Sequence, residues 1–219
     1  MSDLSESARV AELRLGGPVE PWSRLGFAVR ESSDGPCVTV AGLGFRFVDD
    51  APGSVESAVT GWTLVGATSG PDDVDGIATR WIDEPANSPA PGNRVHVSSI
   101  DHIVIMTGSL DRTSECIDRI LGAPRKRVRD AGGGVRQGFH RAGDIILEVV
   151  ERPDLDPDTA ASLWGVVFVV DDLDATVAWL GPDAVSAPRD AVQPGRRIAS
   201  IRREVGLGLP VALMTPHVR

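Results

Sequence analysis

The chain has 219 residues, 42% of them apolar and 24% charged, and no apolar run approaches the roughly 18 to 20 residues that a membrane-spanning helix needs. This composition is typical of an ordinary globular protein and predicts no membrane partner. The formal net charge of -9 argues against a nucleic-acid partner, because such binding depends on basic side chains that neutralise phosphates. The first ten residues, MSDLSESARV, lack the apolar core of a secretory signal, so we expect a cytoplasmic protein.

The first part of the chain predicts a strand, a short helix and three further strands. Residues 9 to 15 alternate as a strand does, and PVEPWSRLGF has a proline near the start of a short helix. The stretches CVTVAG, LGFRFVDD and GWTLVGA then have the composition of strands. We interpret residues 1–80 as a degenerate N-terminal βαβββ-like module.

A linker is predicted over residues 81–97. Within it the sequence DEPANSPAPGNR contains three prolines and no apolar periodicity, which is typical of an extended, solvated segment. We therefore expect the second part of the chain to begin at residue 98.

The segment 98–152 predicts a complete βαβββ module. VSSIDHIVIMT is rich in β-branched residues, as strands are, and SLDRTSECIDRILG has apolar residues on one helical face and ends at a glycine. Three strand-like stretches follow, RKRVRDAG, VRQGFHRAG and DIILEVV.

The same pattern recurs 63 positions later, over residues 160–216. The shift places IDHIVIMTGSLDRT on LWGVVFVVDDLDAT, and both predicted helices end in Leu-Gly. GRRIASIRRE and LPVALMT supply the last two strands of this copy. Repeats of a supersecondary unit usually bury their faces against one another, so we predict an α+β fold with two tandem βαβββ modules over 98–219.

These modules resemble the vicinal oxygen chelate superfamily, which includes glyoxalase I, methylmalonyl-CoA epimerase, extradiol dioxygenases and bleomycin resistance proteins. The resemblance rests on DHIVIMTGSLDRT, DIILEVV, FVVDDLDATVAWLG and PVALMTP. It implies that paired modules form a cupped mixed sheet whose cavity holds one divalent metal ion, which chelates neighbouring oxygens of a small-molecule substrate. It also implies that ligands come from the first and last strands of each module.

Only half of the ligand set implied by this resemblance is present. In the first of the two modules the ligand positions carry His102 and Glu148. In the second they carry Gly165 and Ala212, or Val211 if the offset of 63 is kept, and none of these can bind a metal. The expected cofactor is therefore either one Zn, Fe, Mn or Ni ion on His102 and Glu148, or no metal at all.

The residues support this pair without the family. Glu148 lies between apolar neighbours on a strand, where a carboxylate needs a partner, and His102 is the natural candidate. A metal or a direct His102–Glu148 ion pair satisfies this need. A two-residue turn at Ala142-Gly143 would place Gln137 opposite Glu148 on the same sheet face.

Further side chains are predicted to surround a substrate. Met106, Phe139 and Gln137 share the face of His102 and Glu148, and Trp164 precedes the empty position at Gly165. Strand alternation sends Arg196 and Arg197 to opposite faces, so that one arginine enters the cavity, and we assign Arg196 to substrate binding. His140 and His217 are expected to be exposed.

Three functional hypotheses follow. The first is a glyoxalase-like, metal-dependent lyase, isomerase or dioxygenase in which Glu148 is the catalytic proton carrier. The second is a metal-free protein that binds a small molecule, as the bleomycin resistance proteins do. The third is a vestigial fold that serves assembly alone. The apparent odd number of modules also predicts a homodimer, because one half-sheet would lack a partner within the chain.

Overall fold

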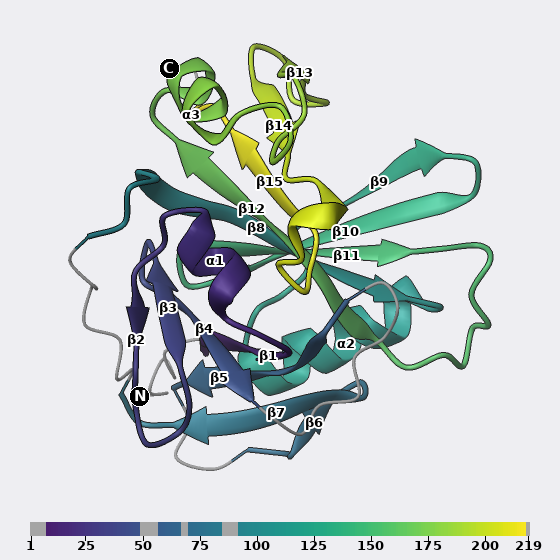
Figure 1. Ribbon diagram of the computed structural model, residues 1–219. Coiled ribbons are helices and arrows are strands. Elements are labelled where there is room, and N and C mark those ends of the chain that lie inside the picture. The colour runs from purple at the N-terminus through teal and green to yellow at the C-terminus, as the bar shows by residue number, and fades with distance from the viewer. Residues whose placement is uncertain (1–7, 49–56, 67–69, 85–91, 218–219) are drawn as a thin grey trace, which may run out of the picture.

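The computed structural model describes residues 8–48, 57–66, 70–84 and 92–217, arranged in two mixed β-sheets (Figure 1). The N-terminal half contains β1 (Arg9–Gly16), α1 (Glu20–Arg24), β2 (Val29–Arg30), β3 (Cys37–Val40), β4 (Leu43–Val48), β5 (Val59–Val65), β6 (Asp73–Val74) and β7 (Ile77–Ile82). The C-terminal half contains β8 (Val97–Thr107), α2 (Leu110–Leu121), β9 (Arg127–Gly132), β10 (Val135–Ala142), β11 (Ile145–Glu151), β12 (Ser162–Val170), α3 (Leu173–Leu180), β13 (Arg189–Asp190), β14 (Arg197–Ser200), a 3-10 helix (Arg203–Val205) and β15 (Val211–Met214).

The C-terminal sheet has the predicted module architecture. Its eight strands lie in the order β13-β14-β15-β12-β8-β11-β10-β9. In each module the first strand pairs parallel with the last, β8 with β11 and β12 with β15, and the two first strands pair antiparallel at the centre. The predicted α+β fold with tandem βαβββ modules is confirmed.

The N-terminal sheet differs from the prediction in one respect. Its seven strands lie in the order β2-β3-β4-β1-β5-β7-β6. GWTLVGA, expected to close the module, forms β5, which pairs antiparallel with β1, and β7 then pairs parallel with β5. The chain itself therefore supplies the partner half-sheet, through β5 and β7. Among the described residues no helix lies between these two strands. The premise behind the predicted homodimer, an odd module count, is wrong.

β7 also enters the predicted linker. The strand runs to Ile82, whereas we expected the linker to begin at residue 81, and β8 starts at Val97. Residues 85–91 of the predicted linker lie outside the described residues.

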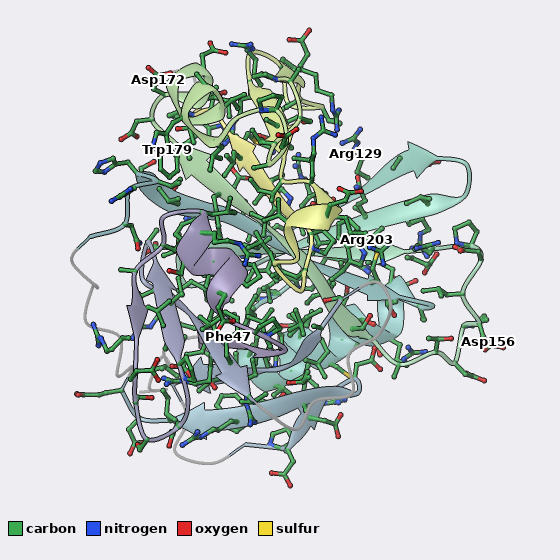
Figure 2. All side chains as sticks on the ribbon, viewed as in Figure 1. Phe47, Arg129, Asp156, Asp172, Trp179 and Arg203 are labelled. Atoms are coloured by element: carbon green, nitrogen blue, oxygen red, sulfur yellow. The ribbon has the colours of Figure 1, made fainter. Side chains whose placement is uncertain are left out.

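One hydrophobic core joins the two sheets. The Trp22 ring lies 4.5 Å from the Phe45 ring and 6.5 Å from the Phe168 ring, so that aromatic side chains from both halves pack together. Figure 2 shows Phe47 among the side chains between the sheets and Asp156 at the periphery. Burial of large aromatic surfaces stabilises such contacts strongly. The two halves therefore share their core.

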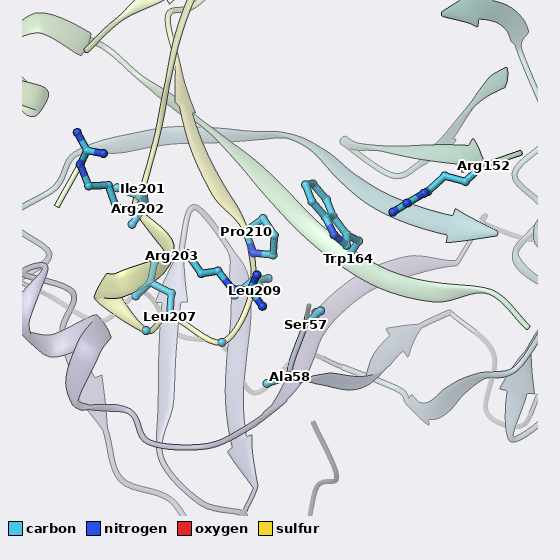
Figure 3. Close-up of a pocket in the computed structure, with 12 residues that line it drawn as sticks. Ser57, Ala58, Arg152, Trp164, Ile201, Arg202, Arg203, Leu207, Leu209 and Pro210 are labelled. Atoms are coloured by element: carbon cyan, nitrogen blue, oxygen red, sulfur yellow. The ribbon is translucent and has the colours of Figure 1, made fainter. Parts of the chain in front are cut away.

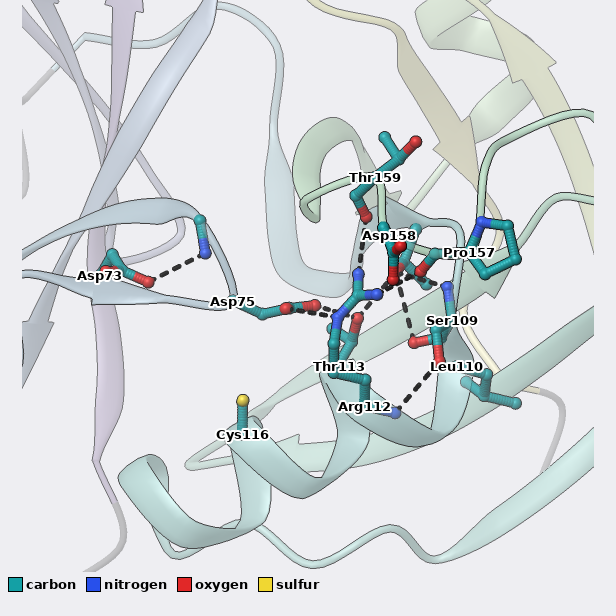
Figure 4. A network of polar contacts seen from close by, with 12 residues as sticks. Asp73, Asp75, Ser109, Leu110, Arg112, Thr113, Cys116, Pro157, Asp158 and Thr159 are labelled. Atoms are coloured by element: carbon teal, nitrogen blue, oxygen red, sulfur yellow. Dashed lines mark hydrogen bonds and ion pairs between the residues drawn. The ribbon is translucent and has the colours of Figure 1, made fainter.

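A polar contact also ties the halves together (Figure 4). Asp75, in the turn between β6 and β7, accepts a hydrogen bond from Arg112 Nε at 2.7 Å and a second one from the Thr113 hydroxyl. Arg112 also donates to the Thr159 carbonyl at 2.6 Å. Because Arg112 and Thr113 lie in the first turn of α2, this contact fixes that helix against the N-terminal sheet.

The sequence signals of α2 are those of a well-capped helix. The Ser109 hydroxyl accepts a hydrogen bond from the Arg112 amide, and the helix ends at Gly122 in the left-handed conformation, with φ of 64°. No helix among the described residues is both long and apolar enough to cross a membrane.

Candidate functional site

Five of the predicted site residues lie on the face of the C-terminal sheet that turns away from α2, which we call the site face: His102, Met106, Gln137, Phe139 and Glu148. Strand pairing assigns each residue to a face: His140 pairs with Leu147 and points to α2, whereas Phe139 pairs with Glu148 and points away. On β8, His102 and Met106 share the face of Glu148, because β8 and β11 pair in parallel register. The sheet thus places the predicted residues together.

A β-bulge sets the geometry of the histidine. His102 pairs with Val167, but the next pair is Ile100 with Phe168, so Asp101 is an extra residue in β8. A bulge interrupts the strict alternation of side chains and often redirects one of them beside a functional site. Here the Asp101 and His102 side chains meet, with Asp101 Oδ2 at 2.7 Å from His102 Nδ1.

The predicted pair of His102 and Glu148 is in contact. His102 Nε2 lies 3.1 Å from Glu148 Oε2, and the two side chains are 14% and 13% exposed. The imidazole therefore lies between two carboxylates, with Asp101 on Nδ1 and Glu148 on Nε2. The Asp101 contact fixes the ring, as carboxylates do for metal-binding histidines.

The predicted strand register of β10 is wrong, although its face is right. Gln137 pairs with Val150 rather than with Glu148, because the turn is formed by Gly143 and Asp144 and not by Ala142 and Gly143. Gly143 has φ of 64°, which glycine adopts readily.

The register moves by two residues, so Gln137 stays on the site face. Its Nε2 donates to Glu148 Oε1 at 2.6 Å across the diagonal between the two strands. Its Oε1 is buried and has no hydrogen-bond partner among the described residues.

Arg196 points inward and contacts a carboxylate of the protein itself. The guanidinium is 2.6 Å from Asp101 Oδ1 and donates from Nε to the Thr215 carbonyl at 2.8 Å. Arg197 points outward to Asp174, so the predicted division of the two arginines is observed. Burial alone would raise the pKa of Asp101, but hydrogen bonds from His102 and Arg196 outweigh it and lower that pKa to about 2.

Charge favours a cation between His102 and Glu148. Arg196, Asp101 and Glu148 carry one positive and two negative charges, so a neutral His102 leaves one negative charge in a partly buried site. Burial of an uncompensated charge is costly. A proton on Nε2 or a divalent cation would compensate it.

The donor atoms fit a divalent cation with open coordination positions. His102 Nε2, a Glu148 oxygen and the unpartnered Gln137 Oε1 are an imidazole, a carboxylate and an amide, which suit zinc, manganese or iron. Among the described residues no group of three or more His, Cys, Asp or Glu side chains could hold a metal. A bound cation would therefore depend on the amide and on water or substrate.

The facing strands contribute no further ligand. Val167 pairs with His102, and Ala212 pairs with Val167. Gly165 has no room for a side chain, because an added Cβ would lie 2.8 Å from the Pro210 carbonyl oxygen. The close approach of the Pro210 backbone to Gly165 thus accounts for the absence of a ligand side chain at this position.

One cavity among the described residues lies away from most of the predicted site residues. It has a volume of about 500 Å³ and, of the predicted substrate-binding residues, only Trp164 lines it (Figure 3). Met106, Phe139 and Gln137 lie on the site face but do not line this cavity. Arg196 lies against Asp101 instead.

Two residues were misjudged or missed from the sequence. His140 is buried rather than exposed, with Nδ1 2.8 Å from the Ala123 carbonyl and Nε2 3.0 Å from the Ser114 hydroxyl, and burial lowers its pKa. Asp101 was missed, since regular alternation would have turned it away from His102. The only signal was its position directly before the histidine. The His217 side chain, 72% exposed, is at the surface as expected.

Comparisons with known proteins agree with this fold. Residues 99–194 match the family model of the Glyoxalase/Bleomycin resistance protein/Dioxygenase superfamily. No curated protein matches the chain. A solved mutant of 4-hydroxymandelate synthase from Streptomyces coelicolor has a similar fold over 97% of this chain and 94% of its own, with a TM-score of 0.64 and 14% identity.

A second solved structure matches a shorter part of the chain. Methylmalonyl-CoA epimerase from Mycobacterium tuberculosis covers 56% of this chain and 90% of its own, with 19% identity and a TM-score of 0.46. The family model and the strand pairing together confirm the resemblance inferred from the sequence. Residues 99–194 are therefore similar to the Glyoxalase/Bleomycin resistance protein/Dioxygenase superfamily.

Proposed function

We propose that this protein is a glyoxalase-like lyase or isomerase that acts on a small oxygenated metabolite with one divalent cation on His102 and Glu148. The observation that carries the proposal is the contact series Asp101–His102–Glu148. In this series His102 Nε2 and the Glu148 carboxylate face the same point, and Asp101 fixes the imidazole ring through its other nitrogen, Nδ1. Such preorganisation is what a metal site requires.

Each residue has a separate task in this proposal. When bound, the cation would polarise a substrate carbonyl. Asp101, kept ionised by Arg196, holds His102 Nδ1 and so directs Nε2 toward the substrate side. The Glu148 carboxylate accepts a proton from the carbon next to that carbonyl and returns it. Gln137 Nε2 orients this carboxylate by donating a hydrogen bond to Glu148 Oε1.

The decisive experiment is metal analysis of the purified protein and of two histidine variants. We expect one divalent ion per chain in the parent, none in His102→Ala, and an unchanged content in His96→Ala. His96 is exposed and is therefore a matched control. Absence of a stoichiometric metal after loading with zinc, manganese or iron, or equal content in both variants, would reject the metal site.

A metal-free binding protein is the second candidate. It is favoured by the apolar side chains at the facing positions, Val167 and Ala212, and by the His102–Glu148 contact, which a single proton satisfies. This candidate predicts that a small organic ligand raises the melting temperature of chelator-treated protein while metals do not. If neither metals nor organic ligands bind, the third hypothesis, a role in assembly, remains.

A homodimer remains a prediction without its original premise. β5 and β7 complete the N-terminal sheet within the chain, so pairing between chains is not needed to complete it. Light scattering coupled to size-exclusion chromatography at several concentrations tests the dimer directly.

A further inference from the structure

The outer part of the site face carries two arginines on β9, which is the last strand of the C-terminal sheet beyond β10 (Figure 1). Arg127 pairs with Phe139 on β10. Arg129 pairs with Gln137 in the same way. Because residues that pair across neighbouring strands point to the same side of a sheet, both arginines lie on the site face together with Glu148.

On the opposite side of these strands, toward α2, the arginines are paired with acids. Arg125 Nη1 lies 2.6 Å from Asp111 Oδ1. Arg136 lies 3.3 Å from the carboxylates of both Asp111 and Glu151. The positive charges on that side are therefore compensated within the protein.

The two arginines of the site face have no such partners. Both are exposed, and among the described residues neither side chain takes part in an ion pair or a hydrogen bond. The chain as a whole is acidic, with a formal net charge of -9, so this positive edge does not follow from its composition. Arg127 and Arg129 thus present two guanidinium groups that an external anion can neutralise.

Phe139 fixes the position of one of these groups. The guanidinium carbon of Arg127 lies 4.4 Å from the centroid of the Phe139 ring, so the cation lies over the aromatic face. This contact requires no hydrogen-bond acceptor, and the five N–H donors of the guanidinium have none among the described residues. Arg127 is therefore oriented beside the site while its donors remain free for a ligand.

The spacing of the strands sets the distance between these arginines and the proposed cation. Neighbouring strands lie about 4.8 Å apart, so the Arg127 backbone is two strands, or roughly 10 Å, from that of Glu148. The Arg127 guanidinium extends over Phe139, on the strand between them, so its charge lies closer than its backbone. An anionic group roughly 5–10 Å from a carbonyl at His102 and Glu148 can therefore reach it.

The charges on the site face also determine which way such a molecule would lie. Asp101 and Glu148 repel an anion at the histidine end, whereas Arg127 and Arg129 attract one at the outer edge. Apolar side chains of the same face lie between or beside these two ends: Val104, Met106, Phe139 and Val150. An apolar body can pack on them with its anionic group turned outward.

We propose that the substrate of the site face carries a carboxylate or a phosphate that Arg127 and Arg129 bind, while its carbonyl end faces His102 and Glu148. The inference rests on the proposed function only in placing the carbonyl end. An apolar body of roughly 5–10 Å separates the two ends. The two arginines are therefore substrate-binding residues that determine specificity for an anion.

Isothermal titration of the full chain with three rigid probes tests the proposal. 4-Acetylbenzoate and 4-acetylphenylphosphonate carry a carbonyl and an anionic group at opposite ends of one aromatic ring, and 4-acetylbenzamide is their neutral counterpart. We expect one or both anions to bind at least about tenfold more tightly than the amide. Comparison of the two anions shows which anionic group is preferred. Failure of both anions to bind at millimolar concentration, or equal binding of the amide, would overturn the proposal.

Three arginine variants locate the anionic group. Arg127→Gln and Arg129→Gln should each weaken binding of the preferred anion about threefold or more and leave the amide unchanged. Arg125→Gln is the matched control, because it removes the same charge from the same segment but on the side of α2, and should change binding less than about twofold. An equal loss in Arg125→Gln would mean that only the general charge matters, which contradicts the proposal. Unfolding midpoints check that the variants are folded.

The metal site is tested separately in the same proteins. We expect the preference for the anion over the amide to persist in chelator-treated protein, and the metal content of Arg127→Gln and Arg129→Gln to equal that of the parent. If metal binds but the anion and the amide bind equally, this inference fails and the proposed metal site stands. If the preference persists but no metal binds, the anion site stands and the metal site fails.

An edge strand offers a different explanation for its arginines, because charged side chains there can prevent pairing between chains. Light scattering of Arg127→Gln and Arg129→Gln distinguishes the two roles. We expect the variants to have the same molar mass as the parent. Variants that form larger assemblies and keep the full preference for the anion would show that the arginines protect the edge and do not bind the substrate.

Discussion

The two sheets carry different side chains at two structurally equivalent positions. In the N-terminal sheet Glu12 pairs with Thr63, and Ala11 is the extra residue of a bulge, as Asp101 is before His102. Arg46 lies two residues beyond the β4 partner of Glu12, and Glu148 lies two beyond the β11 partner of His102. Glu12 and Arg46 thus correspond to His102 and Glu148.

The difference lies in where the positive charge comes from. Arg46 Nη2 is 2.7 Å from Glu12 Oε1, and the side chains are 11% and 9% exposed, so the N-terminal pair contains its own cation. The C-terminal pair is a histidine and a carboxylate, which need a proton or a metal from outside. One backbone geometry therefore supports two different pairs. Glu12 and Arg46 form a complete ion pair, which we call the closed pair, whereas His102 and Glu148 need an added cation, and we call them the open pair.

The largest effect is expected from breaking the closed pair. Arg46→Met leaves the Glu12 carboxylate buried without its partner, which should lower the free energy of unfolding by about 3–5 kcal/mol. The double variant Glu12→Leu with Arg46→Met removes both charges and should recover most of this loss. Denaturant unfolding of the three proteins measures both effects. A loss below about 1 kcal/mol in the single variant would mean that the pair contributes little.

The open pair should respond to metal where the closed pair does not. At a metal concentration of about one hundred times Kd, binding adds about 2.7 kcal/mol to the free energy of unfolding. We expect this gain in the parent and in Arg46→Met, and none in His102→Ala. Unfolding curves with metal and with chelator give the gain for each protein. A gain that persists in His102→Ala would place the metal elsewhere.

The bulge in β8 carries the Asp101 carboxylate, so its contribution to the free energy of unfolding should depend on pH, unlike that of the bulge in β1. The pKa of Asp101 is lowered from 3.8 to about 2, so the carboxylate stabilises the folded state above about pH 4, and this contribution disappears as the pH falls toward 2. The difference in unfolding free energy between the parent and Asp101→Asn should therefore be about 2 kcal/mol near neutral pH and shrink over this range.

An exposed carboxylate provides the control for this pH dependence. Asp34 pairs with Arg80 at the surface, where its side chain is 54% exposed, and Asp34→Asn should show little change over the same range. A constant difference between the parent and Asp101→Asn from pH 5 to pH 2 would contradict the assignment.

The smallest effect concerns the amide beside the open pair. Gln137→Met removes the unpartnered Oε1 and the hydrogen bond to Glu148, and should weaken metal binding about tenfold, or about 1.4 kcal/mol. Titration with metal measures the change, and unfolding in chelator checks the fold. An unchanged metal affinity would exclude the amide from the site.

Sequence periodicity predicted what depends on residue type and spacing. The βαβββ order of the C-terminal half and the shared face of His102, Glu148 and Gln137 follow from alternation with a period of two. Alternation also predicted that Arg196 and Arg197 lie on opposite faces, but it does not determine which of the two points inward.

The rest depends on single-residue choices that the sequence does not display. The register of β10 changed because Gly143 and Asp144, rather than Ala142 and Gly143, form the turn, and both pairs contain the glycine that such a turn needs. Asp101 was missed because nothing in IDHIV indicates an extra residue. The partner of Arg196 could not be predicted either, since it lies 95 positions away in the chain.

The bulge before His102 also bears on how such a site can arise or disappear. β1 has the same extra residue, but there it is Ala11. The backbone feature that brings two consecutive side chains together is thus present in both sheets, whatever residue occupies it. Descent with change at that one position can add or delete an orienting carboxylate while every strand keeps its partners. In this fold a single substitution can therefore add the carboxylate that orients the histidine, without any change in strand pairing.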